Sequence, residues 1–321
     1  MLPRTILFVI PQNVQLMDIA GPSDVFDEAN TLYGHQYYRI VIAGPTSVIR
    51  SSSGIALQVD YDLAGAANLN IDTCIVAGSP RAANTEPDEE LASWLFHVYP
   101  NVRRMCSICG GIFPLAKSSL INDQVVAAHW NDKTALETSF PGITVDQDAI
   151  LVVNGSIRTA AGVSAGLDLG LSLVTEDLGS DIARQVAQQL IVFYKRPGGQ
   201  LQYAHNKQLA PAGRSALQNL QRRILQNLNG NHSVDSMAQS LGLSRRHLIR
   251  LFEKETGLSP TKWVETARVS AARVLLEEEL KAPKVVASRC GFSSVRSLRR
   301  AFLQQIGISP ADYRRRFGSS K

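Results

Sequence analysis

A cysteine and a histidine in the first half of the chain are of the residue types that form a nucleophile and its base. Cys109 follows an apolar run, Val102 to Ile108, and precedes a glycine turn at Gly110-Gly111. A strand, a sharp turn and a helix in this order present a thiol near backbone amides and the positive pole of the helix, which lower a thiol pKa. Cys109 is thus a candidate nucleophile, with His129 as its candidate base if the fold brings the two together. The alternative interpretation is a pair of unreactive side chains.

The other cysteines indicate neither redox nor metal chemistry. Cys106 and Cys109 have the spacing of a dithiol redox motif, but Cys106 falls within the predicted strand rather than on a helix turn. Cys74 and Cys290 stand alone and are interpreted as small buried apolar residues. The sequence has no His and Cys cluster with metal spacing and no Gly-rich phosphate loop. We therefore expect no metal and no cofactor.

Arginines form a second chemical pattern, in the last third of the chain. Leu248, Leu251 and Phe252, at spacings of three and four, predict the buried face of a helix. At about 100° per residue, Arg246 and Arg250 then point away from that face. The planar fork of arginine can bond both acceptors of a guanine edge, and its charge also suits phosphates. The pattern therefore predicts a helix that reads DNA.

The same arrangement occurs a second time further along the chain. Leu298, Ala301 and Phe302 are the predicted buried positions, and Arg296 and Arg300 point outward. No acidic residue accompanies these arginines on the outward face, as it would on an ordinary solvated helix. Two helices of the same design are therefore expected.

Both helices belong to an internal repeat. The segment from Gly242 to Pro260 recurs from Gly291 to Pro310, and from Ser244 onward the two copies are offset by 50 residues. Upstream of each glycine turn lies a short helical pattern with a small residue, Ala238 or Ala287, where a second helix can pack closely. A serine after each turn can cap the following helix. This is the pattern of a helix-turn-helix, present twice.

Charge is distributed unevenly along the chain. From residue 212 to the end there are 20 Lys and Arg against 8 Asp and Glu, a net charge of +12, whereas residues 1–211 carry a net charge of −7. Only the C-terminal third therefore suits a polyanion. This distribution supports double-stranded DNA as the partner of the repeat.

The elements that must position these residues follow from apolar periodicity. The first two thirds alternate short apolar runs with amphipathic stretches, as in a parallel sheet with helices on both faces. Predicted strands are 5–10, 38–43, 73–77 and 102–108, and predicted helices include 89–98, 110–120, 165–177 and 181–194. We predict an α/β fold with a flavodoxin-like doubly wound parallel sheet, followed by an all-α domain with two helix-turn-helix units.

Proline and glycine mark the predicted domain boundary. Arg196 to Gly199 and Ala210 to Gly213 read as linker ends. We predict a first domain over residues 1–195, a linker over 196–213 and a DNA-binding domain over 214–321.

The segment from Arg214 to Phe317 resembles the DNA-binding domain of the AraC/XylS family of transcriptional regulators. The resemblance implies that a helix from Thr261 to Glu278 joins two helix-turn-helix units. These would enter successive major grooves, about 34 Å apart, on one side of the duplex. Because Val295 stands where the first copy has Arg245, phosphate contacts are expected to differ between the units. The resemblance is carried by Cys290–Ser294, Leu298–Phe302 and Gly307–Arg314.

Residues 4–194 resemble the ThiJ/PfpI branch of the class I glutamine amidotransferase-like superfamily, as in regulators that fuse such a domain to an AraC-type one. The resemblance implies that Cys109 is the nucleophile position, His129 the pocket histidine and Asp18 the acidic residue near the nucleophile. It also implies an oxyanion-binding amide at Gly78-Ser79. The matching stretches are Leu16–Pro22, Val25–Phe26, the turn at Cys109, His129–Trp130 and Thr159–Gly166.

Two departures from that family pattern bear on catalysis. Gly110 stands where proteases of this branch have histidine, and Asn131 stands where an acidic residue would orient His129. A base without an orienting carboxylate is ill suited to amide hydrolysis, unless Asp132 or a distant carboxylate replaces it. The same site can instead bind a small metabolite, with Asp18 attracting a cation and Trp130 either offering an aromatic face or serving as core.

We predict a sequence-specific DNA-binding transcriptional regulator, not an enzyme, controlled by a small metabolite bound in the N-terminal domain. The expected effector is an amino acid or amine derivative, and a homodimer and RNA polymerase are expected as partners. The apolar run near the N-terminus is too short for a signal peptide or membrane span, so we expect a cytoplasmic protein without a membrane partner. The alternative is a cysteine-dependent hydrolase or lyase fused to a DNA-binding domain, with Cys109, His129 and Asp18 as its catalytic residues.

Two sets of site residues follow from these hypotheses. The predicted ligand-binding residues are Asp18, Gly78, Ser79, Cys109, Gly110, His129 and Trp130. The predicted DNA-binding residues are Ser244, Arg245, Arg246, His247, Arg250, Ser294, Arg296, Ser297, Arg299 and Arg300.

Overall fold

The computed structural model describes residues 2–195, 199–200, 216–256, 258–278 and 282–317, which fall into two units, residues 1–200 and 201–321. Most of the predicted linker, residues 196–213, lies outside the described residues, and the predicted domain boundaries stay predictions. Within the described part of the chain, no helix is both long and apolar enough to cross a membrane.

One six-stranded sheet forms the centre of the N-terminal unit. Its order is β2-β1-β5-β6-β10-β9; the first five strands are parallel, and β9 runs antiparallel to β10. The winding of the sheet reverses between β1 and β5, as in flavodoxin-like doubly wound sheets. The predicted α/β fold class is therefore confirmed. The strands are β1 (Arg4–Val9), β2 (Tyr38–Ala43), β5 (Ile71–Val76), β6 (Arg104–Ile108), β9 (Leu151–Asn154) and β10 (Ile157–Ala160).

Alternate side chains of the strands build an apolar core on each face of the sheet. In β1, Ile6 and Phe8 pack into one core, and Leu7 and Val9 pack into the other, as the two-residue period of a strand requires. Because both faces are buried, the strands read as nearly continuous apolar runs.

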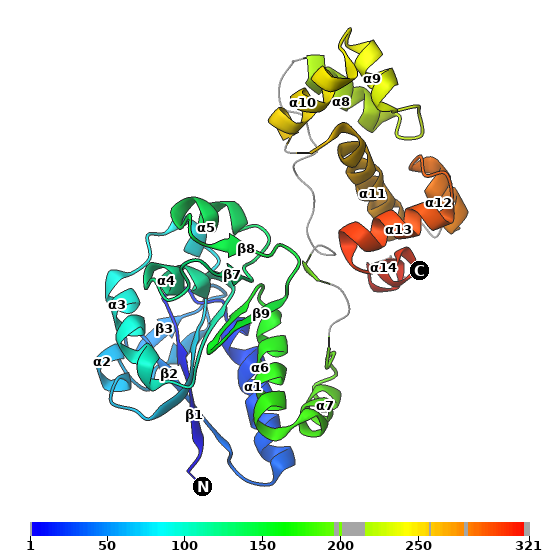
Figure 1. The fold of residues 1–321 in the computed structure, drawn as a ribbon. Coiled ribbons are helices and arrows are strands. Elements are labelled where there is room, and N and C mark those ends of the chain that lie inside the picture. Colours follow the sequence, from blue (N-terminus) through cyan, green and yellow to red (C-terminus); the bar gives the residue numbers. More distant parts are fainter. Residues whose placement is uncertain (1, 196–198, 201–215, 257, 279–281, 318–321) are drawn as a thin grey trace. The chain divides into compact units, whose positions relative to one another are not determined.

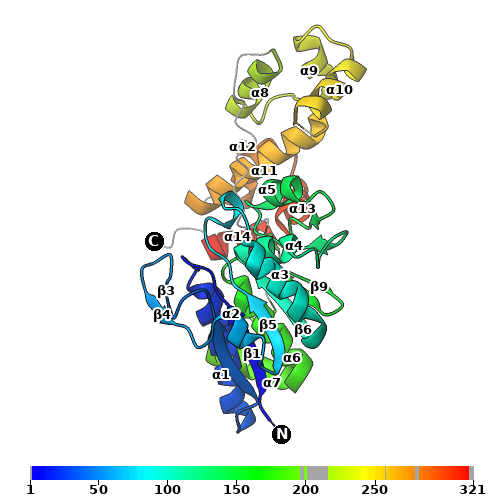
Figure 2. The ribbon, with the colours of Figure 1, turned by 90° about the vertical axis from the view of Figure 1, so that its left-hand side faces the viewer.

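Helices cover both faces of this sheet (Figure 1). The first face packs against α1 (Met17–Tyr33), α6 (Ala165–Leu178) and α7 (Ser180–Gln189). The second packs against α3 (Glu89–Val98) and α4 (Ile112–Lys117), which Figure 2 shows from their own side. The remaining short elements of this unit are α2 (Leu63–Ala66), α5 (Lys133–Ser139), β3 (Val48–Arg50), β4 (Ala56–Gln58), β7 (Val125–Val126), β8 (Thr144–Val145) and the 3-10 turns Ala82–Asn84, Tyr99–Asn101 and Cys109–Gly111.

Three helices differ from the sequence-based prediction. The periodicity does not predict α1, because Gly21-Pro22 reads as a chain break. The helix predicted for 181–194 ends at Gln189, since Ile191 adopts a left-handed φ of 55°. The helix predicted for 110–120 covers only α4, because a 3-10 turn precedes it and Ser119, with a φ of 63°, follows it.

Ion pairs, one of them buried, hold the strand ends opposite the Cys109 turn. Arg104, at the start of β6, is 2% exposed and donates to Asp177 near the end of α6 (2.7 Å). Arg103 pairs with Asp72 and with Asp177, and the Tyr38 hydroxyl also donates to Asp177 (3.0 Å). This network ties the end of α6 to β2 and β6, and through Arg103 to β5, at that end of the sheet.

The described C-terminal unit is entirely helical. Its helices form two groups at opposite ends of the long helix α11 (Figure 1). The predicted all-α domain with two helix-turn-helix units is confirmed: α9 and α10 form the first, and α12 and α13 the second. The helices are α8 (Ala216–Gln226), α9 (Val234–Ser240), α10 (Arg245–Thr256), α11 (Pro260–Glu278), α12 (Pro283–Arg289), α13 (Val295–Ile306) and α14 (Pro310–Phe317).

The turn between the two helices of each unit depends on a glycine and a serine. Gly242 and Gly291 have φ values of 65° and 77°, a left-handed conformation that glycine adopts without steric cost. Ser244 accepts the backbone N–H of His247 (3.3 Å), and Ser294 forms a reciprocal capping box with Ser297. Both second helices therefore begin where the repeat predicts.

Candidate functional site

Cys109 occupies a sharp turn between β6 and α4 at the carboxyl edge of the sheet. Its φ of 52° is left-handed, a strained conformation for a residue with a side chain. A Cβ at Gly78 would lie 2.3 Å from the Gly110 nitrogen, and a Cβ at Gly111 would lie 2.1 Å from the Val76 carbonyl oxygen. Only glycine fits at either position. The backbone is thus that of the predicted strand-turn-helix elbow.

Asp18 lies at the start of α1, fully buried beside this turn. Its Oδ2 accepts the backbone N–H of Gly78 (3.0 Å), and its Oδ1 has no hydrogen-bond partner among the described residues. Burial raises the pKa of Asp18 to about 8, and the hydrogen bond from Gly78 lowers it only in part. The carboxyl group is therefore mostly protonated at neutral pH. The protonated form disfavours attraction of a cation by Asp18, and that role stays a prediction.

The Cys109 thiol is also held in its neutral form. The residue is only 9% exposed, and burial, with a smaller contribution from the Asp18 carboxyl, raises the pKa of the thiol to about 12, although the Gly110 amide lowers it in part. The prediction of a lowered thiol pKa is wrong, because desolvation of the thiolate outweighs the amide. A neutral thiol is a poor nucleophile.

His129 has its Nδ1 occupied by the backbone. The N–H of Asn131 donates to Nδ1 (3.2 Å), so Nε2 carries the proton of the neutral ring. Burial lowers the pKa of His129, and the Asp132 carboxylate opposes that shift. The electrostatic influence of Asp132 also reaches Cys109, but no contact joins Cys109 to His129 among the described interactions. In this state His129 has no free lone pair with which to accept a proton.

Trp130 is half-buried and packs on the histidine. The ring centroids of His129 and Trp130 are 5.0 Å apart. The backbone N–H of Trp130 donates to the side-chain oxygen of Gln200 (3.0 Å), and the Gln200 side-chain amide donates to the carbonyl oxygens of Ala128 and Ala149 (both 2.9 Å). Gln200 therefore fixes the loop that carries the two rings.

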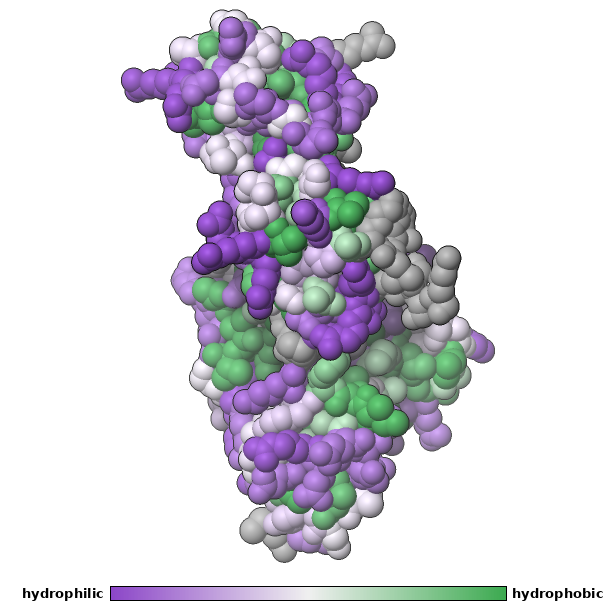
Figure 3. All heavy atoms as spheres, turned by 90° about the vertical axis from the view of Figure 1, so that its right-hand side faces the viewer, coloured by the Kyte–Doolittle hydropathy of each residue, from purple (hydrophilic) through white to green (hydrophobic). Residues whose placement is uncertain are grey.

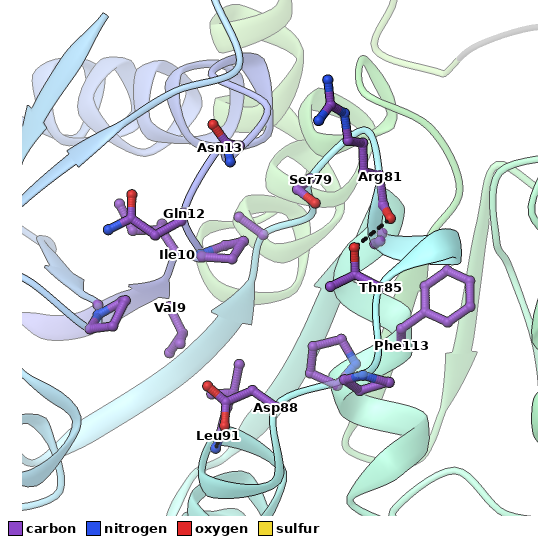
Figure 4. Close-up of a pocket in the computed structure, with 18 of the residues that line it drawn as sticks. Val9, Ile10, Gln12, Asn13, Ser79, Arg81, Thr85, Asp88, Leu91 and Phe113 are labelled. Atoms are coloured by element: carbon purple, nitrogen blue, oxygen red, sulfur yellow. Dashed lines mark hydrogen bonds between the residues drawn. The ribbon is translucent and has the colours of Figure 1, made fainter. Parts of the chain in front are cut away.

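A cavity of about 980 Å³ opens at the carboxyl ends of β1 and β5 (Figure 4). This is where the strand order reverses, the position at which doubly wound sheets bind ligands. The Thr85 hydroxyl donates to the Arg81 carbonyl oxygen (3.0 Å) along one wall. Apolar lining residues include Val9, Ala77, Leu91 and Phe113, and neutral polar ones are Gln12, Asn13, Ser52, Ser79 and Thr85.

Charged side chains of both signs line the same cavity. The Asp88 carboxylate caps α3 by accepting the N–H groups of Glu90 (2.9 Å) and Leu91 (3.3 Å). Glu86 and Arg81 are both exposed. An amine and a carboxylate on one ligand can therefore each meet an opposite charge here.

The cavity contains only part of the predicted ligand-binding set. Ser79 and Gly110 line it, whereas Asp18, Gly78, Cys109, His129 and Trp130 do not. Val9, Leu91 and Phe113 of the lining belong to the core beneath α3 and α4, whereas Ala77 belongs to the core in which Cys109 packs. The cavity thus adjoins the Cys109 turn at Gly110 without including the cysteine.

Several residues of the cavity have no local signal in the sequence. Gln12 and Asn13 follow β1 after Ile10 and Pro11, and a polar pair shortly after a buried strand is the one sign that could have identified them. Arg81 and Thr85 come from an irregular segment with no periodic pattern. Their convergence depends on the fold.

The outward faces of α10 and α13 carry the predicted DNA-binding residues. Leu248 and Phe252 of α10, and Leu298 and Phe302 of α13, are fully buried, which turns the arginines outward. Hydrophilic side chains cover much of the face of the C-terminal unit seen in Figure 3. The exposed members of the predicted set are Ser244, Arg245, Arg246, His247, Arg250, Ser294, Arg296, Arg299 and Arg300, and Ser297 is partly exposed.

The two copies differ at the first position of the second helix. Arg245 lies 3.6 Å from the Asp235 carboxylate, and both side chains are largely exposed. The equivalent Val295 is 41% exposed and has no charge. Among the described residues, no ion pair involves Arg246, Arg250, Arg296, Arg299 or Arg300. These five side chains form a surface with unbalanced positive charge.

Two families match this chain over separate segments. The DJ-1/PfpI family matches residues 4–176, and a helix-turn-helix domain family matches residues 237–316. The first match covers the sheet and the Cys109 turn, and the second covers both copies of the repeat.

Two relatives align with this chain across both segments. The HTH-type transcriptional regulator GlxA of Rhizobium meliloti is 28% identical over 318 residues, which cover 97% of this chain and 96% of the relative. The HTH-type transcriptional regulator GbdR of Pseudomonas aeruginosa is 24% identical over 313 residues, covering 97% and 84%.

A solved structure has the fold of the N-terminal unit. The crystal structure of an AraC family transcriptional regulator from Pseudomonas putida is 19% identical and has a TM-score of 0.52. The match covers 59% of this chain and all of that one. At this identity the likeness shows the fold alone.

Proposed function

The chain belongs to the DJ-1/PfpI family and carries an AraC-type helix-turn-helix domain, and on that premise we propose that it is a cytoplasmic transcriptional regulator whose DNA binding responds to a small metabolite held in the N-terminal unit. One observation carries the DNA-binding role: exposed arginines without acidic partners lie on the outward faces of two capped helices, α10 and α13. Such a surface suits phosphates and guanine edges.

The effector site is the cavity at the carboxyl ends of β1 and β5. Its volume of about 980 Å³ is ample for a metabolite. Apolar side chains, neutral amides and hydroxyls, and charges of both signs line it together. These groups support an amino acid or amine derivative as the class of effector. The predicted site beside Cys109 and His129 remains the alternative location.

Thermal unfolding of the full chain with a panel of amino acids, amines and organic acids tests the site. A compound at 100 times its Kd adds about 2.7 kcal/mol to the free energy of unfolding. Thr85 is exposed and lines the cavity, so Thr85→Trp should fill it and remove the stabilisation. Thr31→Trp, on the exposed side of α1, is the matched control and should keep it.

A third variant separates the two locations. If His129→Ala removes the stabilisation and Thr85→Trp keeps it, the effector binds beside Cys109 and the cavity assignment is wrong. If no compound of the panel stabilises the chain or alters its affinity for a duplex selected from a random library, metabolite control is wrong, and the DNA-binding role is judged separately by that selection.

A cysteine-dependent hydrolase or lyase is the second candidate, favoured by the strained φ of Cys109. The protonation states oppose it: the thiol pKa is raised to about 12, and Nδ1 of His129 is occupied. At Gly78-Ser79, the expected position of an oxyanion-binding amide, the Gly78 N–H is bonded to Asp18 instead. If the unmodified chain converts a compound of the panel and Cys109→Ala does not, the enzyme hypothesis is supported. If the unmodified chain converts no compound, the sensor hypothesis is supported.

The proposal also includes a homodimer formed through the N-terminal unit and a contact with RNA polymerase. Sedimentation of the full chain at micromolar concentration tests the dimer. Transcription from a selected promoter in a purified system tests the contact with the polymerase.

A further inference from the structure

Helix α11 carries the apolar cores of both helix-turn-helix units. Trp263, Val264 and Ala267, in its first half, pack in the core of α8, α9 and α10. Val269 and Ala272 begin the second half, which packs in the core of α12, α13 and α14. The two units therefore share one helix but have separate cores. Contacts at the point where the two halves of α11 meet can therefore fix one helix-turn-helix unit against the other.

Arg268 lies at that meeting point, between the last residue of one core and the first of the other. Its Nε donates to the carbonyl oxygen of Leu228 (3.0 Å), and its NH2 group donates to that of Gly230 (3.4 Å). Both acceptors belong to the turn between α8 and α9, in the first unit. Arg268 is partly buried, so these bonds satisfy a guanidinium that has lost part of its hydration.

The second helix-turn-helix unit contacts the same turn, between α8 and α9, through Gly291. A Cβ at Gly291 would lie 2.1 Å from the Leu228 carbonyl oxygen, 2.9 Å from the Asn229 Cα and 2.8 Å from the Arg268 Nε. Gly291 is the turn glycine between α12 and α13. The backbone of the second helix-turn-helix therefore packs directly on the first unit, against the Arg268 guanidinium.

The repeat provides its own comparison for this contact. Gly242 is the equivalent turn glycine of the first copy and has the same left-handed conformation, with a φ of 65° against 77°. A Cβ at Gly242 would meet nothing within 4 Å. Both positions need glycine for the turn, but only Gly291 also needs it for a contact between units.

We propose that Arg268, Gly291 and the Leu228–Gly230 turn form a clamp that sets the distance and rotation between α10 and α13, and so restricts the chain to one spacing of DNA half-sites. B-DNA turns once in about 10 to 10.5 base pairs, so one added base pair rotates a half-site by about 35° and shifts it by about 3.4 Å. A rigid pair of recognition helices cannot follow that change. The clamp residues position the reading helices and need not touch DNA.

A second contact also joins the two helix-turn-helix units, so removal of the clamp should only partly free one unit from the other. The Gln305 side chain, in α13, donates to the Glu265 carboxylate in the first half of α11 (3.2 Å). Removing the clamp therefore loosens the arrangement without separating the units.

Selection of duplexes from a random library by the full chain tests the proposal without a known operator. The compared proteins are the unmodified chain, Gly291→Ala, Arg268→Met and the control Gly242→Ala, which has the same left-handed backbone cost without the contact. The readout is the gap between the two enriched sequence boxes. The unmodified chain and Gly242→Ala should select a single gap. Gly291→Ala and Arg268→Met should select several gaps and bind the parental duplex about tenfold more weakly.

Affinity for a duplex with one half-site distinguishes positioning from damage. Gly291→Ala and Arg268→Met should keep that affinity within about twofold of Gly242→Ala, since each reading helix is intact. The proposal is overturned if both variants select the single parental gap. The proposal is also overturned if the two variants lose as much affinity for the duplex with one half-site as for the duplex with two. If Gly291→Ala does not unfold cooperatively, its fold is damaged and the result for Arg268→Met decides whether the proposal stands. Arg268→Met changes a side chain only and leaves every backbone contact possible.

Discussion

The turn at Cys109 and the outer faces of α10 and α13 both concentrate ionisable side chains, but in opposite states. At the turn, burial holds the Cys109 thiol and the Asp18 carboxyl largely in their neutral forms at pH 7. On the two helices the arginines are exposed, and an arginine side chain is always charged. Desolvation keeps the groups at the turn neutral although the backbone there is that of a catalytic elbow. Exposure to solvent keeps the arginines charged, so their surface suits a polyanion. Residue type and spacing alone do not make that distinction.

Charge reversal on the exposed side has the largest expected effect. Arg296→Glu with Arg300→Glu should weaken binding to the selected duplex by about 6 kcal/mol, more than ten-thousandfold, because two contacts of about 1–3 kcal/mol each are lost and phosphates repel the new carboxylates. Fluorescence anisotropy at fixed salt measures the change. Arg50→Glu with Arg184→Glu is the control, with the same change of net charge on exposed positions of the N-terminal unit. An equal loss of affinity for the duplex in both double variants would show that the effect comes from net charge and not from contacts of Arg296 and Arg300.

Asp18→Asn tests the neutral state of the buried carboxyl. Its folded pKa of about 8 is above the ordinary value of 3.8, so the folded chain holds a proton that the unfolded chain releases between these pH values. The unmodified chain should therefore lose stability as pH rises from 4 to 8, by on the order of 5 kcal/mol, and Asp18→Asn should lack this loss. Urea unfolding at pH 5 and pH 8 measures the difference. The exposed Asp24→Asn is the control; an Asp18→Asn profile parallel to it would contradict a raised pKa.

Alkylation of Cys109 follows from the same burial. With a thiol pKa of about 12 and 9% exposure, iodoacetamide at pH 8 should modify Cys109 at least about a hundredfold more slowly than free cysteine. Mass spectrometry of the digested chain measures the rate, and Cys109→Ser identifies the peptide. Modification as fast as that of free cysteine would show a reactive thiolate and reopen the catalytic interpretation.

The smallest predicted effect concerns the difference between the two copies of the repeat. Arg245→Val makes the first copy like the second, and should weaken binding by no more than about threefold, because the Asp235 carboxylate already offsets part of this charge. Val295→Arg should strengthen binding by a similar factor through an added phosphate contact. Both are measured by anisotropy on one duplex. A tenfold loss in Arg245→Val would mean that Arg245 reads a base.

The helices and fold class were largely predictable because their signals are local. The positions of Leu298, Ala301 and Phe302 predict the buried face of α13, and all three are buried. The helix α1 has the same kind of apolar face, but Gly21-Pro22 interrupts its pattern and hides it. Tertiary packing around that proline overrides a local signal that would ordinarily end a helix.

The electrostatic state of the site was not predictable from the sequence. The turn at Cys109 follows from its glycines, yet the thiol pKa depends on burial and on Asp18, which lies far away in the chain. The cavity combines loops after β1 and β5 with the start of α4, so no single segment identifies it. Burial and convergence of distant loops are properties of the folded chain.

The central claim is that the N-terminal unit acts by binding and the C-terminal unit by reading DNA, without chemistry at Cys109. The most direct test titrates an effector from the panel against the full chain on its selected duplex, with the unmodified chain and Cys109→Ala side by side. The predicted result is a shift of the duplex Kd by the same factor in both proteins, with the compound recovered unchanged. A shift that disappears in Cys109→Ala, together with consumption of the compound by the unmodified chain, would contradict the claim.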